Sequence, residues 1–118
     1  MSYKNRITII GNVSQAPEVR TTKAGTEVCN FSVATNHFWY NANGEKQTNA
    51  EYHSCSAWDK LVPRCETLRV GQKVEVEGRL KENKWDKPCN ECGAQMHQYR
   101  YEIQVNSILY LERKDEDS

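Results

Sequence analysis

The sequence predicts an all-β domain, in which five strands form a closed barrel and one short helix lies between the third strand and the fourth. Five segments have the β-branched composition or the polar–apolar alternation that is typical of strands, and one segment alone has helical spacing. A chain of 118 residues is long enough for one core and too short for two independent ones. We therefore expect one domain over residues 1–111, followed by a short charged tail over residues 112–118, which has no apolar residue to dock and should be disordered.

The first two strands are predicted from β-branched residues and from a period of two. Residues 6–13 form the first strand, with Gly11 as a bend or bulge, and residues 14–18 (SQAPE) are expected to end it. Residues 27–36 form the second strand. Their alternation with polar neighbours assigns three side chains to the core: Cys29, Phe31 and Val33.

The remaining strands are predicted after polar segments. Residues 51–58 follow a polar loop that contains the turn sequence NANG at residues 41–44. Residues 73–80 and residues 98–106 both alternate, and a bend is expected at Gly78 in the first of these segments. Five strands with one short helix between the third and the fourth is the element order of an OB-fold, a five-stranded Greek-key barrel.

The predicted helix covers residues 59–68. Leu61, Cys65 and Leu68 share one face, and Gly71 provides a stop signal. Pro63 is compatible with a helix only within the first turn, so the helix is expected to begin a residue or two after residue 59 or to start irregularly.

Four large aromatic residues lie in or beside predicted strands and have polar or basic neighbours: Trp39, Tyr52, Trp58 and Trp85. Trp39 precedes the polar turn, and Trp85 is surrounded by Lys, Glu, Asn and Asp, so neither has an apolar setting that would bury it. Such rings suggest a stacking surface for unpaired bases, where each base contributes roughly 1–3 kcal/mol without regard to sequence. The alternative is that Tyr52 and Trp58, six residues apart on one strand face, belong to the core.

The net charge of zero argues against a protein that coats nucleic acid by electrostatics alone. Residues 112–118 hold four acids and two bases, so residues 1–111 carry fourteen bases against twelve acids, a net charge of +2. Any affinity must therefore depend strongly on stacking. As a group, six basic residues are the candidates for phosphate contacts: Arg20, Lys60, Arg79, Lys81, Lys84 and Lys87.

Several fragments, in this order and spacing, resemble the bacterial single-stranded DNA-binding protein family over roughly residues 4–111. The fragments are IGNV at 10–13, APEVR at 16–20, NFSVAT at 30–35, EYH at 51–53, WDKL at 58–61, VEGRL at 76–80 and KW at 84–85. The resemblance implies an OB-fold, a homo-oligomer that is a tetramer rather than a dimer, single-stranded DNA wrapped over aromatic and basic surfaces, and no catalysis.

The same resemblance assigns roles to individual residues. It places stacking rings at Trp39 at the end of the second strand, at Tyr52 and Trp58 on the third, and at Trp85 in a loop leaving the fourth. Tyr52 stands where the family often has Trp, which reduces the stacking area and adds a hydroxyl. His53 matches a position at the family's subunit interface, although a lone His beside a strand is more often a structural residue.

A cysteine pair, Cys89 and Cys92, lies between the last two predicted strands, where the family does not typically carry one. With His97 it forms C-x2-C-x4-H, which supplies three of the four tetrahedral ligands that zinc prefers. The fourth ligand would be Glu102, a Cys from elsewhere in the chain or a Cys from a second subunit. Redox pairing and an ordinary loop are the other interpretations, and no cofactor is otherwise required.

Three further hypotheses compete with single-stranded DNA binding. An OB-fold adaptor of the primosome type is favoured by the C-terminus, because residues 115–118 (DEDS) lack the family's usual acidic tip that closes on apolar residues. Single-stranded RNA binding is the second hypothesis, because the sequence shows no residue that would distinguish RNA from DNA at the 2′-hydroxyl. An enzyme is least favoured, because the three histidines are far apart in sequence and no nucleophile signature accompanies them.

The localisation is predicted from the lack of a signal peptide and of a membrane-spanning segment in the sequence. The first residues contain no apolar signal-peptide stretch, and no apolar run approaches the roughly 20 residues that a membrane span requires. We expect no membrane association and a cytoplasmic, nucleoid-associated protein, whose five cysteines are kept reduced.

Overall fold

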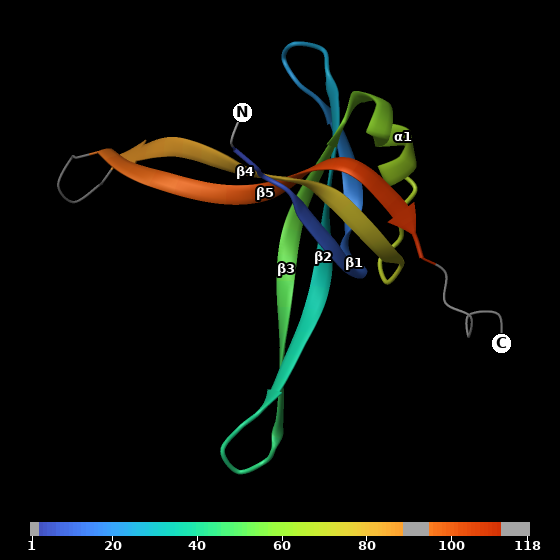
Figure 1. Ribbon diagram of the computed structural model, residues 1–118. Helices are drawn as coiled ribbons and strands as arrows, with labels where there is room; N and C mark the ends of the chain where they lie inside the picture. The colour runs from blue at the N-terminus through green and yellow to red at the C-terminus, as the bar shows by residue number, and fades with distance from the viewer. Residues whose placement is uncertain (1–2, 89–94, 112–118) are drawn as a thin grey trace.

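The computed structural model describes residues 3–88 and 95–111, and it describes the side chains of these residues except within 85–88 and 95–99. Five strands form a closed barrel in the order β1-β2-β3-β5-β4, and two short helices lie between β3 and β4 (Figure 1). The elements are β1 (Ile7–Thr21), β2 (Glu27–Tyr40), β3 (Lys46–Trp58), the 3-10 helix η1 (Asp59–Leu61), α1 (Val62–Cys65), β4 (Lys73–Pro88) and β5 (Gln95–Tyr110). The predicted five-stranded OB-fold barrel is confirmed.

The barrel closes through one short parallel contact. β1 pairs antiparallel with β2 and with β4, while β2 pairs with β3 and β4 with β5 in long antiparallel ladders. β3 and β5 run parallel, and among the described residues their register consists of the pairs Cys55 with Ile103 and Ser56 with Gln104. Because this seam has so few backbone pairs, side-chain contacts across it matter for closure.

Two hairpins extend beyond the barrel as two-stranded arms (Figure 1). The β2–β3 ladder continues to the pair Tyr40 with Lys46, and the β4–β5 ladder continues to the pair Pro88 with Gln95. The prediction that residues 46–50 belong to a polar loop was therefore wrong. Polar residues can form the β2–β3 arm because it is a hydrogen-bonded hairpin in which residues 36–40 and 48–52 are exposed, so neither face needs apolar side chains.

The turn at the tip of the β2–β3 arm was predicted correctly. The Oδ1 atom of Asn41 accepts hydrogen bonds from the backbone N–H groups of Asn43 and Glu45, both at 2.9 Å. Gly44 has a φ of 80°, a conformation that glycine adopts without steric cost.

β1 runs to Thr21, so the prediction that it ends at residues 14–18 was wrong. Its ladder with β2 has register shifts between Val13 and Gln15 and between Gln15 and Glu18. Pro17 lies within the second shift, where an interrupted ladder tolerates a residue with no N–H to donate.

The helical segment is shorter than the predicted span of residues 59–68. It consists of η1 and the single turn of α1, and Pro63 lies in the first turn of α1, as its chemistry requires. The irregular start that Pro63 predicts is confirmed, because a 3-10 turn precedes the α-helical turn. Neither helix, within the described residues, is long and apolar enough to cross a membrane.

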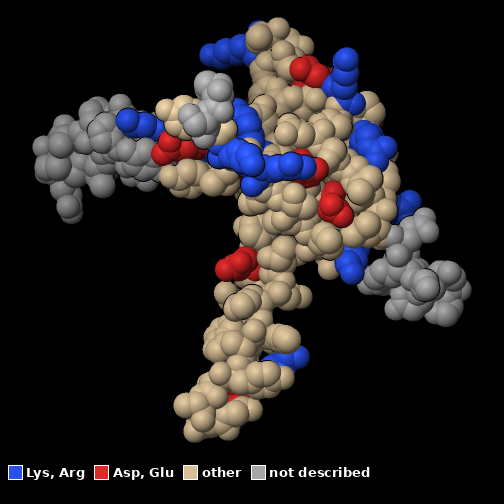
Figure 2. Space-filling view, viewed as in Figure 1, with Lys and Arg blue, Asp and Glu red and all other residues tan. Residues whose placement is uncertain are grey.

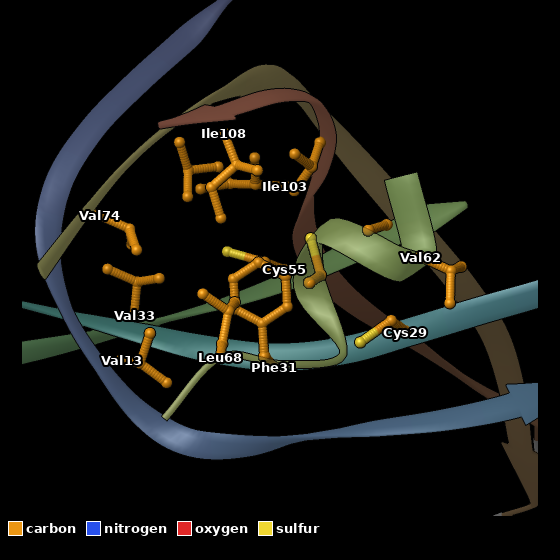
Figure 3. Packing of buried hydrophobic residues seen from close by; sticks show 14 residues of the cluster. Val13, Cys29, Phe31, Val33, Cys55, Val62, Leu68, Val74, Ile103 and Ile108 are labelled. Carbon is orange, nitrogen blue, oxygen red and sulfur yellow. The ribbon is translucent and has the colours of Figure 1, made fainter. Parts of the chain in front are cut away.

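The core fills the barrel interior, and it includes Val62, Cys65 and Leu68 from the segment between β3 and β4. Figure 3 shows side chains of this cluster. Cys29, Phe31 and Val33 are all buried, as their alternation predicts. Burial raises the pKa of the Cys55 and Cys65 thiols to about 12 and also raises the pKa of Cys29. These three thiols are therefore protonated at neutral pH and pack as small apolar side chains.

Candidate nucleic-acid interface

Strand alternation gives the β2–β3 arm two distinct faces. Residues that pair directly across an antiparallel ladder point to the same face, and successive residues point to opposite faces. Tyr52 pairs with Ala34 and Phe38 pairs with Thr48, which places Tyr52 and Phe38 on one face. Trp39 pairs with Gln47 and lies on the opposite face. The four predicted stacking rings therefore do not form one surface, since Trp39 and Tyr52 point to opposite sides of the arm.

The face that carries Tyr52 continues along β3 onto the outside of the barrel. Tyr52, Ser54, Ser56 and Trp58 alternate with the buried Cys55 and Ala57, so their side chains point outward. Tyr52 is 69% exposed, which excludes a place in the core, while Trp58 is half-buried. We call this run from Tyr52 to Trp58 the outer track.

Trp58 is held by a chain of hydrogen bonds rather than by apolar packing alone. Its Nε1 donates to the Oγ of Ser56 at 3.3 Å, and that Oγ donates to the Oε2 of Glu102 at 2.5 Å. The Nδ2 of Asn83 donates to the other carboxylate oxygen at 3.0 Å. The Nζ of Lys81 lies 5.6 Å from the centre of the Trp58 ring. The ring is thus fixed in orientation next to a cation.

Three of the predicted basic residues share the outward face with Trp58. In the β4–β5 ladder Lys81 pairs with Glu102 and Arg79 pairs with Gln104, which are outward positions of β5. Arg20 pairs with Val28, and Val28 pairs with Trp58, so Arg20 shares that face at the end of β1.

A shallow hollow lies across this face. Residues of β1, β2, β3 and β5 line it: Gln15, Arg20, Asn30, Phe31, Ser32, Ser54, Cys55, Arg100 and Glu102. In Figure 2, Lys and Arg side chains gather where the β4–β5 arm leaves the barrel. The face thus combines aromatic rings, cations and hydrogen-bonding side chains. The carboxylate of Glu102 on this face accepts hydrogen bonds from Ser56 and Asn83.

Two other predicted basic residues have described side chains, Lys60 and Lys84. Lys60 is exposed in η1, two residues beyond Trp58, and so lies at the end of the outer track. Lys84 pairs with Tyr99 and occupies the opposite face of β4 from Lys81.

Trp85 pairs with Gln98 inside the β4–β5 ladder, so its predicted place in a loop was wrong. The side chains of Trp85, Lys87 and His97 lie outside the described part of the structure, as do residues Cys89 and Cys92 as a whole. Among the described residues, no group of three or more His, Cys, Asp and Glu side chains could hold a metal ion.

His53 lies on the reverse face, away from the outer track. Its Nε2 is 2.9 Å from the Oγ1 of Thr35, and the residue is half-buried. Its ring therefore has a hydrogen-bond partner within its own chain.

Sequence reasoning missed two exposed rings, Phe38 and Tyr40, which share the face of Tyr52. It also missed His37, whose ring stacks on Trp39 with centroids 5.7 Å apart and an angle of 26° between planes. Counting alternate positions back from Tyr52 through the NANG turn would have found Phe38 and Tyr40, because such a hairpin fixes the register of its strands.

Comparisons with known proteins agree with this architecture. The model of the single-strand binding protein family matches residues 4–111. Single-stranded DNA-binding protein 1 of Chlorobaculum tepidum is 35% identical over 112 residues, which cover 94% of this chain and 67% of that protein. The single-stranded DNA-binding protein of Neisseria meningitidis is 32% identical over 115 residues, covering 97% of this chain and 63% of that protein. The chain thus spans about two thirds of the length of these relatives.

Solved structures show the same fold. A Plasmodium falciparum SSB in complex with single-stranded DNA superposes with a TM-score of 0.78 at 26% identity, over 95% of this chain and 98% of that one. A deletion mutant of the single-stranded DNA-binding protein from Thermus aquaticus superposes with a TM-score of 0.76 at 21% identity, over 94% of this chain and 52% of that one. With a family model that matches nearly the whole barrel and relatives above 30% identity, this chain belongs to the single-strand binding protein family.

Proposed function

We propose that this protein binds single-stranded DNA with little sequence preference and protects it during replication, recombination or repair. The observation that carries the proposal is the outer track, where exposed Tyr52 and hydrogen-bonded Trp58 lie on one face beside Lys81 and Arg79. Stacked bases supply affinity through their faces, which every base has, while the cations meet phosphates. The names of the relatives support DNA as the ligand.

The shape of this surface supports a ligand without secondary structure. Flat rings on the outside of a barrel can stack only on bases that are free of pairing, and the short helices η1 and α1 are too small to read a duplex groove. A non-catalytic role accords with a family defined by binding. The family match favours this function over the adaptor hypothesis.

Tryptophan fluorescence tests the proposal directly. Titration with oligo-dT should quench the emission, because bases stack on Trp58 and on the other predicted tryptophans. A duplex of the same length, at the same salt concentration, serves as the control and should quench much less. Unchanged emission and no binding of oligo-dT at low salt would refute the proposal.

A parallel titration with oligo-U addresses the choice between DNA and RNA. We expect tighter binding of oligo-dT, since the names of the relatives specify DNA. Equal or tighter binding of oligo-U would favour the RNA hypothesis instead.

We further propose a homotetramer in which His53 lies at a subunit interface, and a cytoplasmic, nucleoid-associated location. Support for the assembly comes from family membership and from the place of His53 on the face opposite the outer track. Sedimentation of the native protein gives its mass, and His53→Ala should shift that mass downward. A monomer with unaltered binding would contradict the assembly.

The zinc site at Cys89, Cys92 and His97 is a proposal that rests on spacing alone. Elemental analysis of protein purified without chelator should find about one zinc per chain if the site is real. Replacement of Cys89 and Cys92 by Ser should then abolish the bound metal, whereas metal-free wild-type protein would refute the site.

A further inference from the structure

We infer that the shallow hollow beside the outer track reads the edge of one guanine base in the bound single strand, with Glu102 accepting its N–H groups and Arg20 donating to its O6 and N7 atoms. This is the hollow lined by residues of β1, β2, β3 and β5, and we call it the seam hollow. The inference rests on the proposed single-stranded DNA binding. It adds a preference at one nucleotide position to binding that is otherwise insensitive to sequence.

The first step is the position of the seam hollow between two rings. Tyr52 and Trp58 are six residues apart on β3, so a strand that stacks on both must cross roughly 20 Å between them. Ser54, which points outward between the two rings, lines the hollow. A base in this interval lies over the hollow rather than over either ring.

The second step is the polar chemistry of the lining. Its outward side chains carry hydroxyls and amides: Gln15 on β1, Asn30 and Ser32 on β2, and Ser54 on β3. The Oγ of Ser32 donates to the Oε1 of Gln15 at 3.2 Å, which holds that amide in place. Stacking needs no such groups, whereas the edge of an unpaired base carries donors and acceptors that they can satisfy. The hollow has a volume of about 240 Å³, below the roughly 300–1,000 Å³ of pockets that enclose a drug-sized molecule, so it suits a single base.

The third step is the carboxylate of Glu102, which selects the base. Glu102 is half-buried on β5, and its two oxygens accept one hydrogen bond each, from Ser56 and from Asn83. A carboxylate has about four lone-pair sites, so each oxygen can accept one more donor. Because it repels phosphate, a carboxylate on a surface that binds a polyanion suits a base edge that offers N–H groups. Guanine is the one DNA base with donors on two adjacent atoms of an edge, at N1 and at the N2 amine.

The fourth step is a cation on the other side of the same space. Arg20 is exposed near the end of β1 and lines the seam hollow, which Glu102 lines from β5. A guanidinium donates two parallel hydrogen bonds to the O6 and N7 atoms of guanine. These atoms lie next to the N1 and N2 edge, so one guanine can meet both side chains at once. Adenine, cytosine and thymine each lack at least one of the two pairs of groups.

The test uses the full chain and oligonucleotides that compete with fluorescently labelled oligo-dT, with binding measured by anisotropy. The competitors are oligo-dT and the same oligonucleotide with one central dG, dA or dC. Two more carry altered guanines at that place: inosine, which lacks the N2 amine, and 7-deazaguanine, which lacks N7. The variants are Glu102→Gln, Arg20→Gln and the control Lys23→Gln, whose exposed side chain lies in the β1–β2 turn outside the hollow.

Affinities are compared as ratios between oligonucleotides on the same protein, so a change in stability does not enter the result. The wild type should bind the dG oligonucleotide about fivefold or more tightly than oligo-dT, the lower end of what a bidentate base contact contributes. The dA and dC oligonucleotides should bind close to oligo-dT. Inosine and 7-deazaguanine should each lose most of the gain.

Each variant should remove the preference for one part of the base. In Glu102→Gln, the ratio of dG to inosine should fall toward one, because an amide presents a single acceptor to the two donors. In Arg20→Gln, the ratio of dG to 7-deazaguanine should fall toward one, because the fork of donors is gone. Lys23→Gln should keep every wild-type ratio.

The outcomes separate this inference from the proposed function. If the wild type binds oligo-dT and all the substituted oligonucleotides equally, the function stands and the guanine site is refuted. If the preference for dG persists unchanged in both Glu102→Gln and Arg20→Gln, or if Lys23→Gln loses as much of it, the seam hollow is not where the base is read. If the wild type binds none of the oligonucleotides, both proposals fall.

Discussion

The Oγ of Ser56 on β3 donates a hydrogen bond to the Oε2 of Glu102 on β5 at 2.5 Å, across the parallel seam between these two strands. Ser56 is 1% exposed, and its oxygen also accepts the indole N–H of Trp58. The buried Ser56 hydroxyl thus bonds both to the strand that closes the barrel and to the ring of Trp58, a predicted stacking residue. This coupling leads to the first prediction.

Glu102→Ala should lower the free energy of unfolding by about 1–3 kcal/mol, because it removes the acceptor of the buried Ser56 hydroxyl and of Asn83. The loss should also release Trp58, which would then emit further to the red. Urea unfolding monitored by circular dichroism gives the stability, and the emission spectrum reports on the ring.

Two control variants distinguish this mechanism from a general effect of charge. Glu102→Gln keeps an acceptor in the same place and should lose clearly less stability than Glu102→Ala. Glu51→Ala removes an exposed acid from the arm and should change stability by less than about 0.5 kcal/mol. A loss from Glu51→Ala as large as that from Glu102→Ala would contradict the mechanism.

Tyr52→Trp should increase affinity for oligo-dT, and Tyr52→Ala should reduce it by about 1–3 kcal/mol, because Tyr52 is exposed and its ring is free to accept a base. Neither change should alter the unfolding midpoint much, since most of the side chain is exposed to solvent. Anisotropy titrations at one salt concentration measure the first effect. Tighter binding by Tyr52→Ala than by the wild type would exclude stacking at this position.

Lys81→Gln should reduce the slope of log affinity against log salt by about 0.7, as expected when one phosphate contact on a single strand is lost. Lys84→Gln is the matched control, because Lys84 lies on the same strand and on the opposite face. Its salt slope should stay closer to that of the wild type. Equal slopes for the two variants would show that phosphate contact does not depend on which face of β4 the lysine occupies.

Gly78→Ala should destabilise the barrel by about 1–3 kcal/mol or prevent folding, because a Cβ there would lie 2.1 Å from the backbone oxygen of Gln104. Gly78 borders the register shift in the β4–β5 ladder, where the two backbones approach closely. Gly44→Ala offers the contrast, since nothing surrounds that position and only its φ of 80° opposes a side chain. Its cost should be at most about 1–2 kcal/mol, and Gly44→Asn should cost less still.

The stability of the protein should fall as the pH rises above about 9. Burial raises the pKa of Cys55 and Cys65 from the ordinary value of 9.0 to about 12 in the folded chain. Between these values the unfolded thiols lose protons while the folded ones keep them, so deprotonation favours unfolding by about 1.4 kcal/mol per pH unit for each thiol. Urea unfolding between pH 8 and pH 10 under reducing conditions measures the slope.

Cys55→Ala provides the control for that slope, because other groups also titrate in this range. In the variant, the free energy of unfolding should fall less steeply with pH than in the wild type. The difference in slope should be at most about 1.4 kcal/mol per pH unit, the contribution of one thiol. Identical slopes for the two proteins would show that Cys55 is not the group responsible.

The sequence predicted the barrel well because a half-buried strand has apolar residues at every second position, on the face that meets the core. Cys29, Phe31 and Val33 were assigned to the core on that basis, and all are buried. The lengths of the strands were predicted less well, because the arms and the end of β1 have no core face and so show no apolar alternation. Pro17 was interpreted as a strand end, yet a bulge keeps β1 continuous around it.

By itself, the sequence determined the fold class, the order of the elements, the core and the presence of unusually placed rings, because burial and turn chemistry are local properties of the chain. Only the tertiary structure decided which rings share a face. Trp39 and Phe38 are neighbours in sequence and lie on opposite sides of the arm, whereas Phe38 and Tyr52 lie far apart in sequence and share a side. The physical reason is that the cross-strand register, which the hairpin turn and the backbone hydrogen bonds set, fixes which side chains meet a common ligand.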